Sequence, residues 1–530
     1  MRTSTHEGIL STVETYANTI LEHGRDRYGD THTPLFVDSL DVDTKEFTPY
    51  PTAHRIRFEY PEAVLANPAT YQDFLRTLVG LTALTGEQRY RTAAEALCAY
   101  TLDELTDDEG LIQWGGHVAW DLETDEPAAW SSVHELKFHY PFYELMWEVD
   151  ERATIEYIEA MWNAHVIDWA ELDFNRHGAF DEPQGLLWEN EYVGEKLFFM
   201  GEGLTFVNAG SDLYYAASML ARFTGADEPL QWAKRLAGRY LETRQGLGIS
   251  GYQFSSKATS RASGPNPGTN LRGDRAEYQF GPYVHGDHLV REGTLFKPKP
   301  RVQRRQLEIG STLGDDGEIF TNWALEELHA WAEHAYRPES NTFEAMLTDG
   351  FPLEGFVLRY DGYYGDRGDV VGPIDAGVEF FWAYAQAYRE SESEICWETA
   401  RSIADGLGLG DIGAETGNGI DLSPGHEHAD YRGLYGLLEL FEATGDDTYL
   451  DAATAIGEGI IDRYYENGLF VAADGVDIQG SYDDRTFSND ARIAITGDKN
   501  PLALLHLAAA IEAGSTESIP RPGGKAGWGY

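Results

Sequence analysis

The feature that most limits the fold is a pattern that recurs along the chain: an apolar-periodic helix, then Thr-Gly, then acidic residues, then a second Ala-rich helix. The three clearest copies start at Leu78, Tyr214 and Leu434. Their glycines, Gly86, Gly225 and Gly445, stand where the C-terminus of a helix favours a left-handed residue. The acidic residues that follow suit the N-terminus of the next helix. The pattern therefore predicts a series of αα-hairpins.

Further helices of the same character are expected over residues 322–336 and 379–405. The spacing between copies is irregular, which argues against an open solenoid of short equal repeats. We therefore predict a mostly α-helical fold, an (α/α)-barrel or toroid of roughly seven helical hairpins, whose inner helices end in loops around one cleft.

Residues 246–310 differ from the rest, because Gly, Tyr, Ser and Arg alternate there with aromatic residues, as in "ISGYQFSSKATS". We predict strands or long loops, inserted in the helical frame and forming an arm over the cleft. No linker separates independent domains. Residues 1–514 are therefore predicted to form a single catalytic domain, and residues 515–530 a C-terminal tail.

The net charge of the chain limits which partners it can bind. The chain has 89 Asp and Glu against 40 Lys and Arg, which gives a formal net charge of -49. The acidic residues are scattered, so they predict a solvated acidic surface on a folded domain. Such a surface repels itself at low salt and is screened at high salt, where the Debye length falls to about 3 Å at 1 M. It resembles the surface of a cytosolic protein from a salt-loving microbe, and it argues against nucleic acid as a partner.

The N-terminal residues, the apolar runs and the cysteines indicate the cellular compartment. The N-terminal residues lack a basic stretch, a continuous apolar stretch and a small-residue cleavage site. No apolar run approaches the roughly 18 residues that span a bilayer, so no membrane partner is expected. The two cysteines, Cys98 and Cys396, lie far apart in helix-like contexts and are expected to be small buried residues. Together these features predict a cytoplasmic protein, in the high-salt cytosol of a halophilic microbe.

Three polar stretches carry the candidate chemistry. "QWGGHVAW" places His117 after a Gly-Gly turn, and "LDFNRHGAF" places Arg176 beside His177. The third stretch, "SSVHELKFHY", opens with a serine pair typical of a helix N-cap and offers Glu135. Two imidazoles and a carboxylate from separate segments make a common ligand set for a divalent metal. The alternative is that these residues make ordinary hydrogen bonds at helix ends.

The sequence "HELKFH" is not the zinc-peptidase motif H-E-x-x-H. Its second histidine, His139, comes five residues after His134, which is one residue too far to share the helix face. A zinc peptidase is therefore not expected.

The order and separation of a His, a Glu and an adjacent Arg-His pair resemble those of family 2 polysaccharide lyases, the pectate lyases built on an (α/α)₇ barrel. The match is concentrated in residues 110–180, and length and helical character agree over the whole chain. The resemblance implies that His117, Glu135 and His177 hold a divalent metal ion, with His134 as the alternative to Glu135. It also implies that Arg176 is the Brønsted base.

The reaction implied by the resemblance is β-elimination of α-1,4-linked galacturonate. The proton on C5 of a uronate is removed, the C4–O bond breaks, and a 4,5-unsaturated sugar end results. The protein would be an enzyme, a metal-dependent pectate lyase acting on an anionic uronate oligosaccharide or polysaccharide. Two histidines and a glutamate suit Mn²⁺, Co²⁺, Ni²⁺ or Zn²⁺ rather than Ca²⁺, which prefers oxygen ligands throughout. The resemblance favours manganese.

An arginine base predicts a particular pH dependence. A free guanidinium group stays protonated near neutral pH. A nearby metal ion and an enclosed cleft both ease the deprotonation of a cation. Activity is therefore expected to rise into the alkaline range.

An anionic substrate requires local cations on this acidic chain. The run "REGTLFKPKPRVQRR" could form an arm that grips uronate carboxylates, or an exposed hairpin paired with acids elsewhere. The segment "LRYDGYYGDRGD" could line the cleft or connect two helices. The predicted substrate contacts are His134, Lys137, Arg301, Arg304, Arg359 and Tyr363.

Two other functions fit the composition. One is an α/α-toroid glycoside hydrolase or unsaturated uronyl hydrolase, which uses paired carboxylates and water without a metal ion. The other is a non-catalytic oligosaccharide-binding protein. Loss of activity in a chelator and an unsaturated, ultraviolet-absorbing product would separate a lyase from both.

Overall fold

The computed structural model describes the chain except for residues 1, 49–59, 61, 130–132, 197–202, 243, 252–259, 262–269, 272–278, 281–298, 362–363, 415–417, 426–427, 473–491 and 525–530. The described part is mostly α-helical, and its longest strands, such as β3 (Val118–Asp121), have four residues. A helix with the length and the low polarity needed to cross a membrane does not occur among the described residues.

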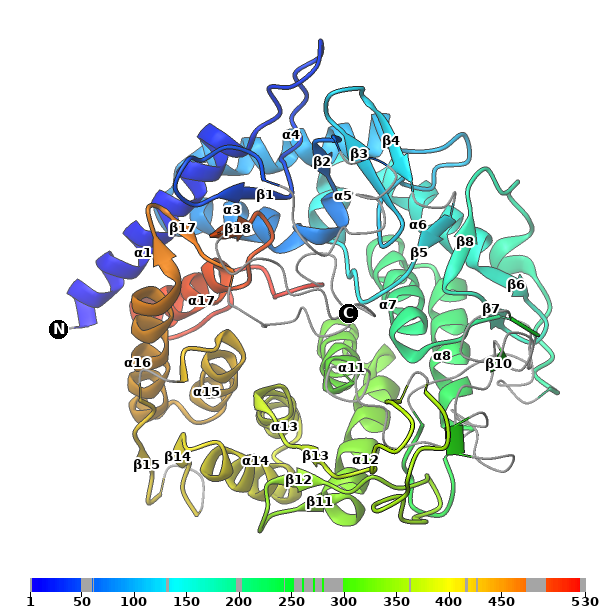
Figure 1. The fold of residues 1–530 in the computed structure, drawn as a ribbon, viewed down its shortest axis with the longest axis vertical. Coiled ribbons are helices and arrows are strands. Elements are labelled where there is room, and N and C mark those ends of the chain that lie inside the picture. Colours follow the sequence, from blue (N-terminus) through cyan, green and yellow to red (C-terminus); the bar gives the residue numbers. More distant parts are fainter. Residues whose placement is uncertain are drawn as a thin grey trace. The chain divides into compact units, whose positions relative to one another are not determined.

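Consecutive helices pack against each other as hairpins, which confirms the predicted mostly α-helical class (Figure 1). The hairpins are α3 (Gln72–Thr85) with α4 (Gln88–Glu104), α7 (Val207–Thr224) with α8 (Asp227–Leu241), α11 (Pro300–Leu313) with α12 (Glu318–His334), α13 (Val378–Ser391) with α14 (Glu394–Gly406), and α15 (Tyr431–Thr444) with α16 (Asp447–Tyr464).

The predicted glycine caps are confirmed. Gly86, Gly225 and Gly445 end α3, α7 and α15 with φ of 74°, 72° and 69°. Each donates its backbone N–H to the carbonyl four residues earlier. Since residues with a Cβ are strained at these φ values, glycine lets the chain reverse directly after Thr-Gly.

The described residues divide into two compact units. The first comprises residues 1–163, 178–184 and 424–530, and the second comprises residues 164–177 and 185–423. The single catalytic domain proposed for residues 1–514 stays a prediction.

In the first unit, α17 (Asn500–Ala513) is enclosed by other helices. It contacts α1 (Arg2–Thr19), α3, α15 and α16. All residues from Pro501 to Ala510 are buried. A helix that is apolar on every side can be stable only when neighbours cover all of it, and these four helices do so.

In the second unit, α11 contacts both α7 and α13, and α12 contacts α14, so the hairpins stand side by side in two layers. Helix α7 is buried along almost its whole length. Its partner α8 instead buries one face, which includes Leu230, Ala233, Leu236 and Tyr240. An apolar helix paired with an amphipathic one is the local arrangement expected in an α/α toroid.

The predicted insertion at 246–310 is wrong in its last part, because α11 begins at Pro300. Proline is favoured at the first position of a helix, and Val302, Leu307 and Ile309 are buried on the side that packs into the unit. The basic side chains hid this helical pattern in the sequence. Of the earlier part, strands β9 (Ser260–Arg261) and β10 (Asn270–Leu271) are described and pair antiparallel.

The predicted C-terminal tail is packed as far as it is described. Ile519 is buried, and the backbone N–H and hydroxyl of Thr516 both donate to Glu442 of α15. Residues 515–524 therefore belong to the first unit as an ordered segment.

Candidate metal centre and active site

Two short strands place the candidate metal ligands. Strands β5 (Val133–Glu135) and β8 (His177–Ala179) form a two-stranded sheet, and Gly115 makes a parallel bridge to Glu135. In this arrangement His117, Glu135 and His177 each offer one ligand atom within 4.8 Å of the others. These three residues form a group that could hold a metal ion, as the sequence predicted.

The helix that the sequence suggested after the serine pair is not formed by residues 133–135. Residues 133–135 form β5, the next helix, α5, starts at Tyr143, and the serines themselves lie outside the described residues. Pairing with β8 overrides the local capping pattern.

His134 and Glu135 are neighbours on strand β5 and have different surroundings. Successive side chains on a strand point to opposite faces. Glu135 faces His117, whereas the rings of His134 and Phe180 form a T-shaped pair with their centroids 6.3 Å apart. His134 is fully buried, and its role in substrate binding stays a prediction.

The carboxylate of Glu135 is completely buried. Its Oε2 lies 3.5 Å from Nε2 of His117 and 2.9 Å from Nζ of Lys137. A Cβ placed on Gly116 would lie 1.7 Å from the same Oε2, so any larger residue at position 116 requires this carboxylate to move. Lys137, a predicted substrate contact, is itself buried and paired with Glu135. Burial makes this negative charge costly unless cations compensate it.

Arg176 is fixed through its backbone and its guanidinium group. Its N–H donates to the carbonyl of Leu204 over 3.1 Å, and its guanidinium carbon lies 5.1 Å from the ring centroid of Phe206. The neighbouring His177 donates its own N–H to the side chain of Asn175. The cation–π contact restricts the positions that the guanidinium group of Arg176 can adopt.

Two of the predicted substrate-binding cations lie on α11. Arg304 forms an ion pair of 2.7 Å with Glu379, and Arg301 lies 3.7 Å from the same carboxylate. The guanidinium carbon of Arg304 is 3.2 Å from the ring centroid of Trp382. Burial lowers the pKa of Arg304, and Glu379 opposes that change. Both arginines therefore pair with an acid, but they are largely buried on helix α11 and do not form the exposed hairpin that was one of the two alternatives for the basic run.

The remaining predicted contacts lie near residue 360. Arg359 is exposed, and its guanidinium carbon lies 5.9 Å from the ring centroid of Phe356. Tyr363 lies outside the described residues. Their roles in substrate binding stay predictions.

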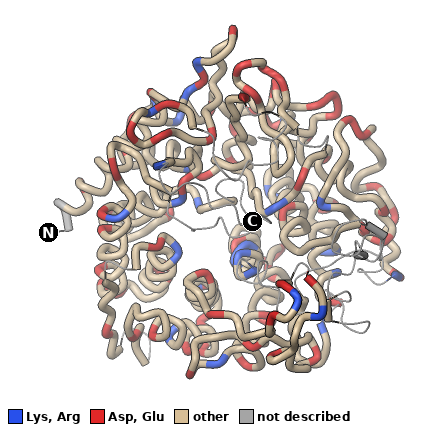
Figure 2. The backbone as a smooth tube through the Cα atoms, in the orientation of Figure 1, with Lys and Arg blue, Asp and Glu red and all other residues tan. Residues whose placement is uncertain are grey.

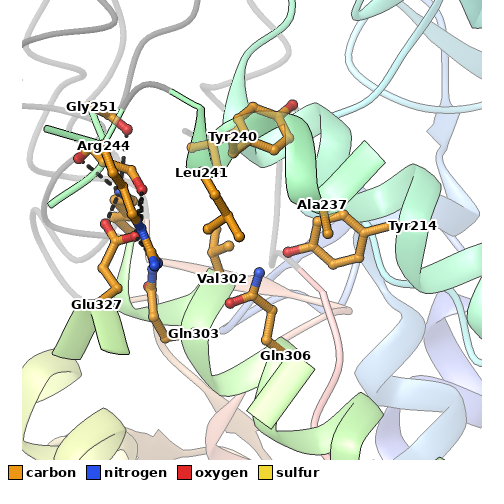
Figure 3. Close-up of a pocket in the computed structure, with 13 residues that line it drawn as sticks. Tyr214, Ala237, Tyr240, Leu241, Arg244, Gly251, Val302, Gln303, Gln306 and Glu327 are labelled. Atoms are coloured by element: carbon orange, nitrogen blue, oxygen red, sulfur yellow. Dashed lines mark hydrogen bonds and ion pairs between the residues drawn. The ribbon is translucent and has the colours of Figure 1, made fainter. Parts of the chain in front are cut away.

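A separate cavity in the second unit contains a buried ion cluster that the sequence did not reveal (Figure 3). Glu327 of α12 accepts from Lys299 over 2.6 Å, from Arg244 over 2.9 Å and from the hydroxyl of Ser250 over 2.7 Å. Burial would raise the pKa of Glu327, but Lys299 and Arg244 lower it below its ordinary value. The cavity holds about 20 Å³, which is room for one water molecule and not for a sugar.

Comparison with known proteins places the chain in a family. The family model described as "Periplasmic pectate lyase" matches residues 33–528. A pectate disaccharide-lyase of Dickeya dadantii (strain 3937) is 30% identical over 485 residues, covering 88% of this chain and 85% of the relative.

Solved structures with a similar course of the chain are far more distant in sequence. The D-mannose isomerase structure is 10% identical, with 95% of this chain and 97% of that one covered and a TM-score of 0.45. The unsaturated glucuronyl hydrolase of Bacillus sp. GL1 is 12% identical, with 97% and 98% covered and a TM-score of 0.41. At such scores these likenesses add nothing about activity. The match to the family model over almost the whole sequence shows that the chain belongs to the periplasmic pectate lyase family, and it is a polysaccharide lyase.

Proposed function

We propose that this protein cleaves α-1,4-linked galacturonate in polygalacturonate or its oligosaccharides by metal-dependent β-elimination. The observation that carries the proposal is the convergence of His117, Glu135 and His177, with Arg176 next to His177 in the chain. Membership of the pectate lyase family supports the substrate class.

The residues present fit a divalent transition metal. Two imidazoles and one carboxylate lie within 4.8 Å of one another, and Gly116 leaves the carboxylate oxygen unobstructed. A mixed nitrogen and oxygen donor set suits Mn²⁺, Co²⁺, Ni²⁺ or Zn²⁺ better than Ca²⁺. We propose Mn²⁺ as the ion used.

The proposed chemistry divides between the ion and the chain. A bound ion would act as a Lewis acid on the uronate carboxylate and stabilise the charge that develops beside C5. Arg176, in its neutral form, accepts the proton from C5. The electron pair of the C5–H bond becomes the C4=C5 double bond, and the electron pair of the C4–O bond leaves with the glycosidic oxygen, which solvent protonates. The resulting guanidinium ion stays held over Phe206.

Chelation provides the direct test. In EDTA the protein should lose the activity that produces ultraviolet-absorbing unsaturated ends, and Mn²⁺ should restore it. His117→Ala should stay inactive after Mn²⁺ is added, because one ligand is missing. His334→Ala is the matched control, since His334 is not one of the three proposed ligands, its side chain is more than one third exposed, and it lies 3.9 Å from the carboxylate of its neighbour Glu333. Cleavage that persists in EDTA without unsaturated ends would instead indicate a hydrolase, and binding without cleavage would indicate a carbohydrate-binding protein.

We also propose that the protein works at high salt, as in the cytosol of a halophilic microbe. The support is the net charge of -49 and the spread of acidic residues over both units (Figure 2). The midpoint of thermal unfolding should rise by several degrees between 0.1 and 1 M KCl, since the Debye length falls from about 10 to about 3 Å. A melting temperature that is insensitive to KCl would contradict this proposal.

A further inference from the structure

The segment Thr516–Gly524, named here the C-terminal strap, begins on the helices of the first unit. Thr516 makes hydrogen bonds of 2.6 and 2.9 Å to the carboxylate of Glu442. Ile519 is 3% exposed and packs against Gly80 of α3, where a Cβ would lie 3.2 Å from its Cγ2. The start of the strap is therefore anchored on both α15 and α3.

The end of the strap enters a buried ion cluster. The N–H of Gly523 donates to Asp73 over 2.8 Å, and Arg76 donates to the same oxygen over 3.2 Å. Lys499 donates both to Asp73 and to the carbonyl of Gly524. Burial would raise the pKa of Asp73, but Lys499 and Arg76 together with these hydrogen bonds lower it. The cluster thus holds an ionised carboxylate to which the strap is directly bonded.

Arg76 also holds the loop that follows the metal-ligand strand β5. Its Nη2 donates to the carbonyl oxygens of Tyr140 and Pro141 over 3.0 and 3.2 Å, and its guanidinium carbon lies 4.9 Å from the ring centroid of Phe142. Phe138 and Tyr140 have φ of 57° and 41°, a conformation that is unfavourable for bulky residues. Such a backbone persists only where its surroundings hold it, and Arg76 does so here.

His139 connects the strap to Glu135. A Cβ on Gly524 would lie 1.6 Å from the carbonyl oxygen of His139, so the strap backbone rests directly on this loop. Nε2 of His139 is hydrogen-bonded to the carbonyl oxygen of Glu135 over 2.9 Å. A continuous chain of contacts therefore runs from Gly524 through His139 to the backbone of the proposed metal ligand.

We propose that the C-terminal strap is a positioning element for the metal centre. By resting on the 138–141 loop and joining the Asp73–Arg76 cluster, it fixes the backbone from which the carboxylate of Glu135 projects. The inference rests on the proposed metal-dependent function. Mutation of a group that orients a metal ligand typically costs roughly 10- to 100-fold in metal affinity or activity, because the group fixes the orientation of that ligand.

The substitution Gly524→Ala tests the strap, because the new methyl group collides with backbone that cannot move away freely. The affinity of the metal-free protein for Mn²⁺, measured by titration calorimetry, is expected to fall at least about tenfold. Amide hydrogen exchange over residues 133–141 should become faster. Gly372→Ala is the control, since a Cβ there meets nothing within 4 Å and needs no positive φ.

A second variant keeps the test decisive if Gly524→Ala does not fold. Ile519→Ala weakens the other anchor of the strap and should produce the same two changes. Unchanged Mn²⁺ affinity and unchanged exchange in a folded strap variant would overturn the inference. If the wild-type protein binds no Mn²⁺, the metal proposal fails by itself. Faster exchange over residues 133–141 in the variants would then still support the strap as the restraint on this loop, and unchanged exchange would refute it.

Discussion

The substitution Arg176→Lys is expected to lower kcat by about a thousandfold, while Mn²⁺ binding stays within a few-fold of wild type. Positioned general bases contribute roughly 10²- to 10⁴-fold to rate. Lysine keeps a positive charge but has a compact head group on a flexible stem, so it does not reproduce the planar guanidinium group over Phe206. The decisive measurement is kcat from the appearance of unsaturated product, combined with calorimetry of metal binding.

Arg235→Lys is the matched control for this experiment. Arg235 also lies over aromatic rings, with its guanidinium carbon 5.1 Å from the ring centroid of Tyr192 and 4.7 Å from that of Trp232. Its replacement should leave kcat near the wild-type value. A kcat for Arg176→Lys within about threefold of wild type would show that Arg176 supplies only charge or structure, because loss of a base costs far more.

The substitution Gly116→Ala should weaken Mn²⁺ binding by at least about 100-fold, the upper end of what loss of a supporting group around a metal ligand costs. A methyl group would lie 1.7 Å from Oε2 of Glu135, so the carboxylate must turn away from His117 and His177. Lyase activity should fall with metal occupancy and recover in part at high Mn²⁺ concentration. Calorimetry and activity measured against Mn²⁺ concentration check both effects.

Two further variants help to interpret the loss of Mn²⁺ affinity in Gly116→Ala. Glu135→Gln removes the charge without adding bulk at residue 116 and should give a similar loss of affinity. Gly246→Ala changes another turn glycine, where an added Cβ would meet nothing within 4 Å. It should leave the Mn²⁺ affinity unchanged. Wild-type affinity in Gly116→Ala would mean that Glu135 does not bind the ion in the position described.

Local features were the ones that the sequence could predict. The Thr-Gly caps at Gly86, Gly225 and Gly445 depend only on backbone conformation and neighbouring residues, so their hairpins were correctly expected. The grouping of His117, Glu135 and His177 was also correctly expected, on the strength of residue types, spacing and family resemblance.

Features that depend on distant partners were missed. Residues 133–135 become a strand because β8 pairs with them, which a serine pair at the start of the segment does not reveal. The sequence left the basic run with Arg301 and Arg304 open between substrate binding and pairing with acids, and it did not identify Glu379 as the partner. Lys499 and Asp73 are 426 positions apart in sequence, and no local pattern marks them as partners.

The interleaved order of the two units has a consequence for synthesis on the ribosome. The first unit needs residues 424–530, because α17 fills the space between α1 and α3. At roughly 5–20 residues per second, the N-terminal helices emerge tens of seconds before α17 exists. During that interval the faces of α1 and α3 that α17 later covers lack this partner, so nascent chains should depend on chaperones. The second unit is nearly continuous in sequence and can fold first.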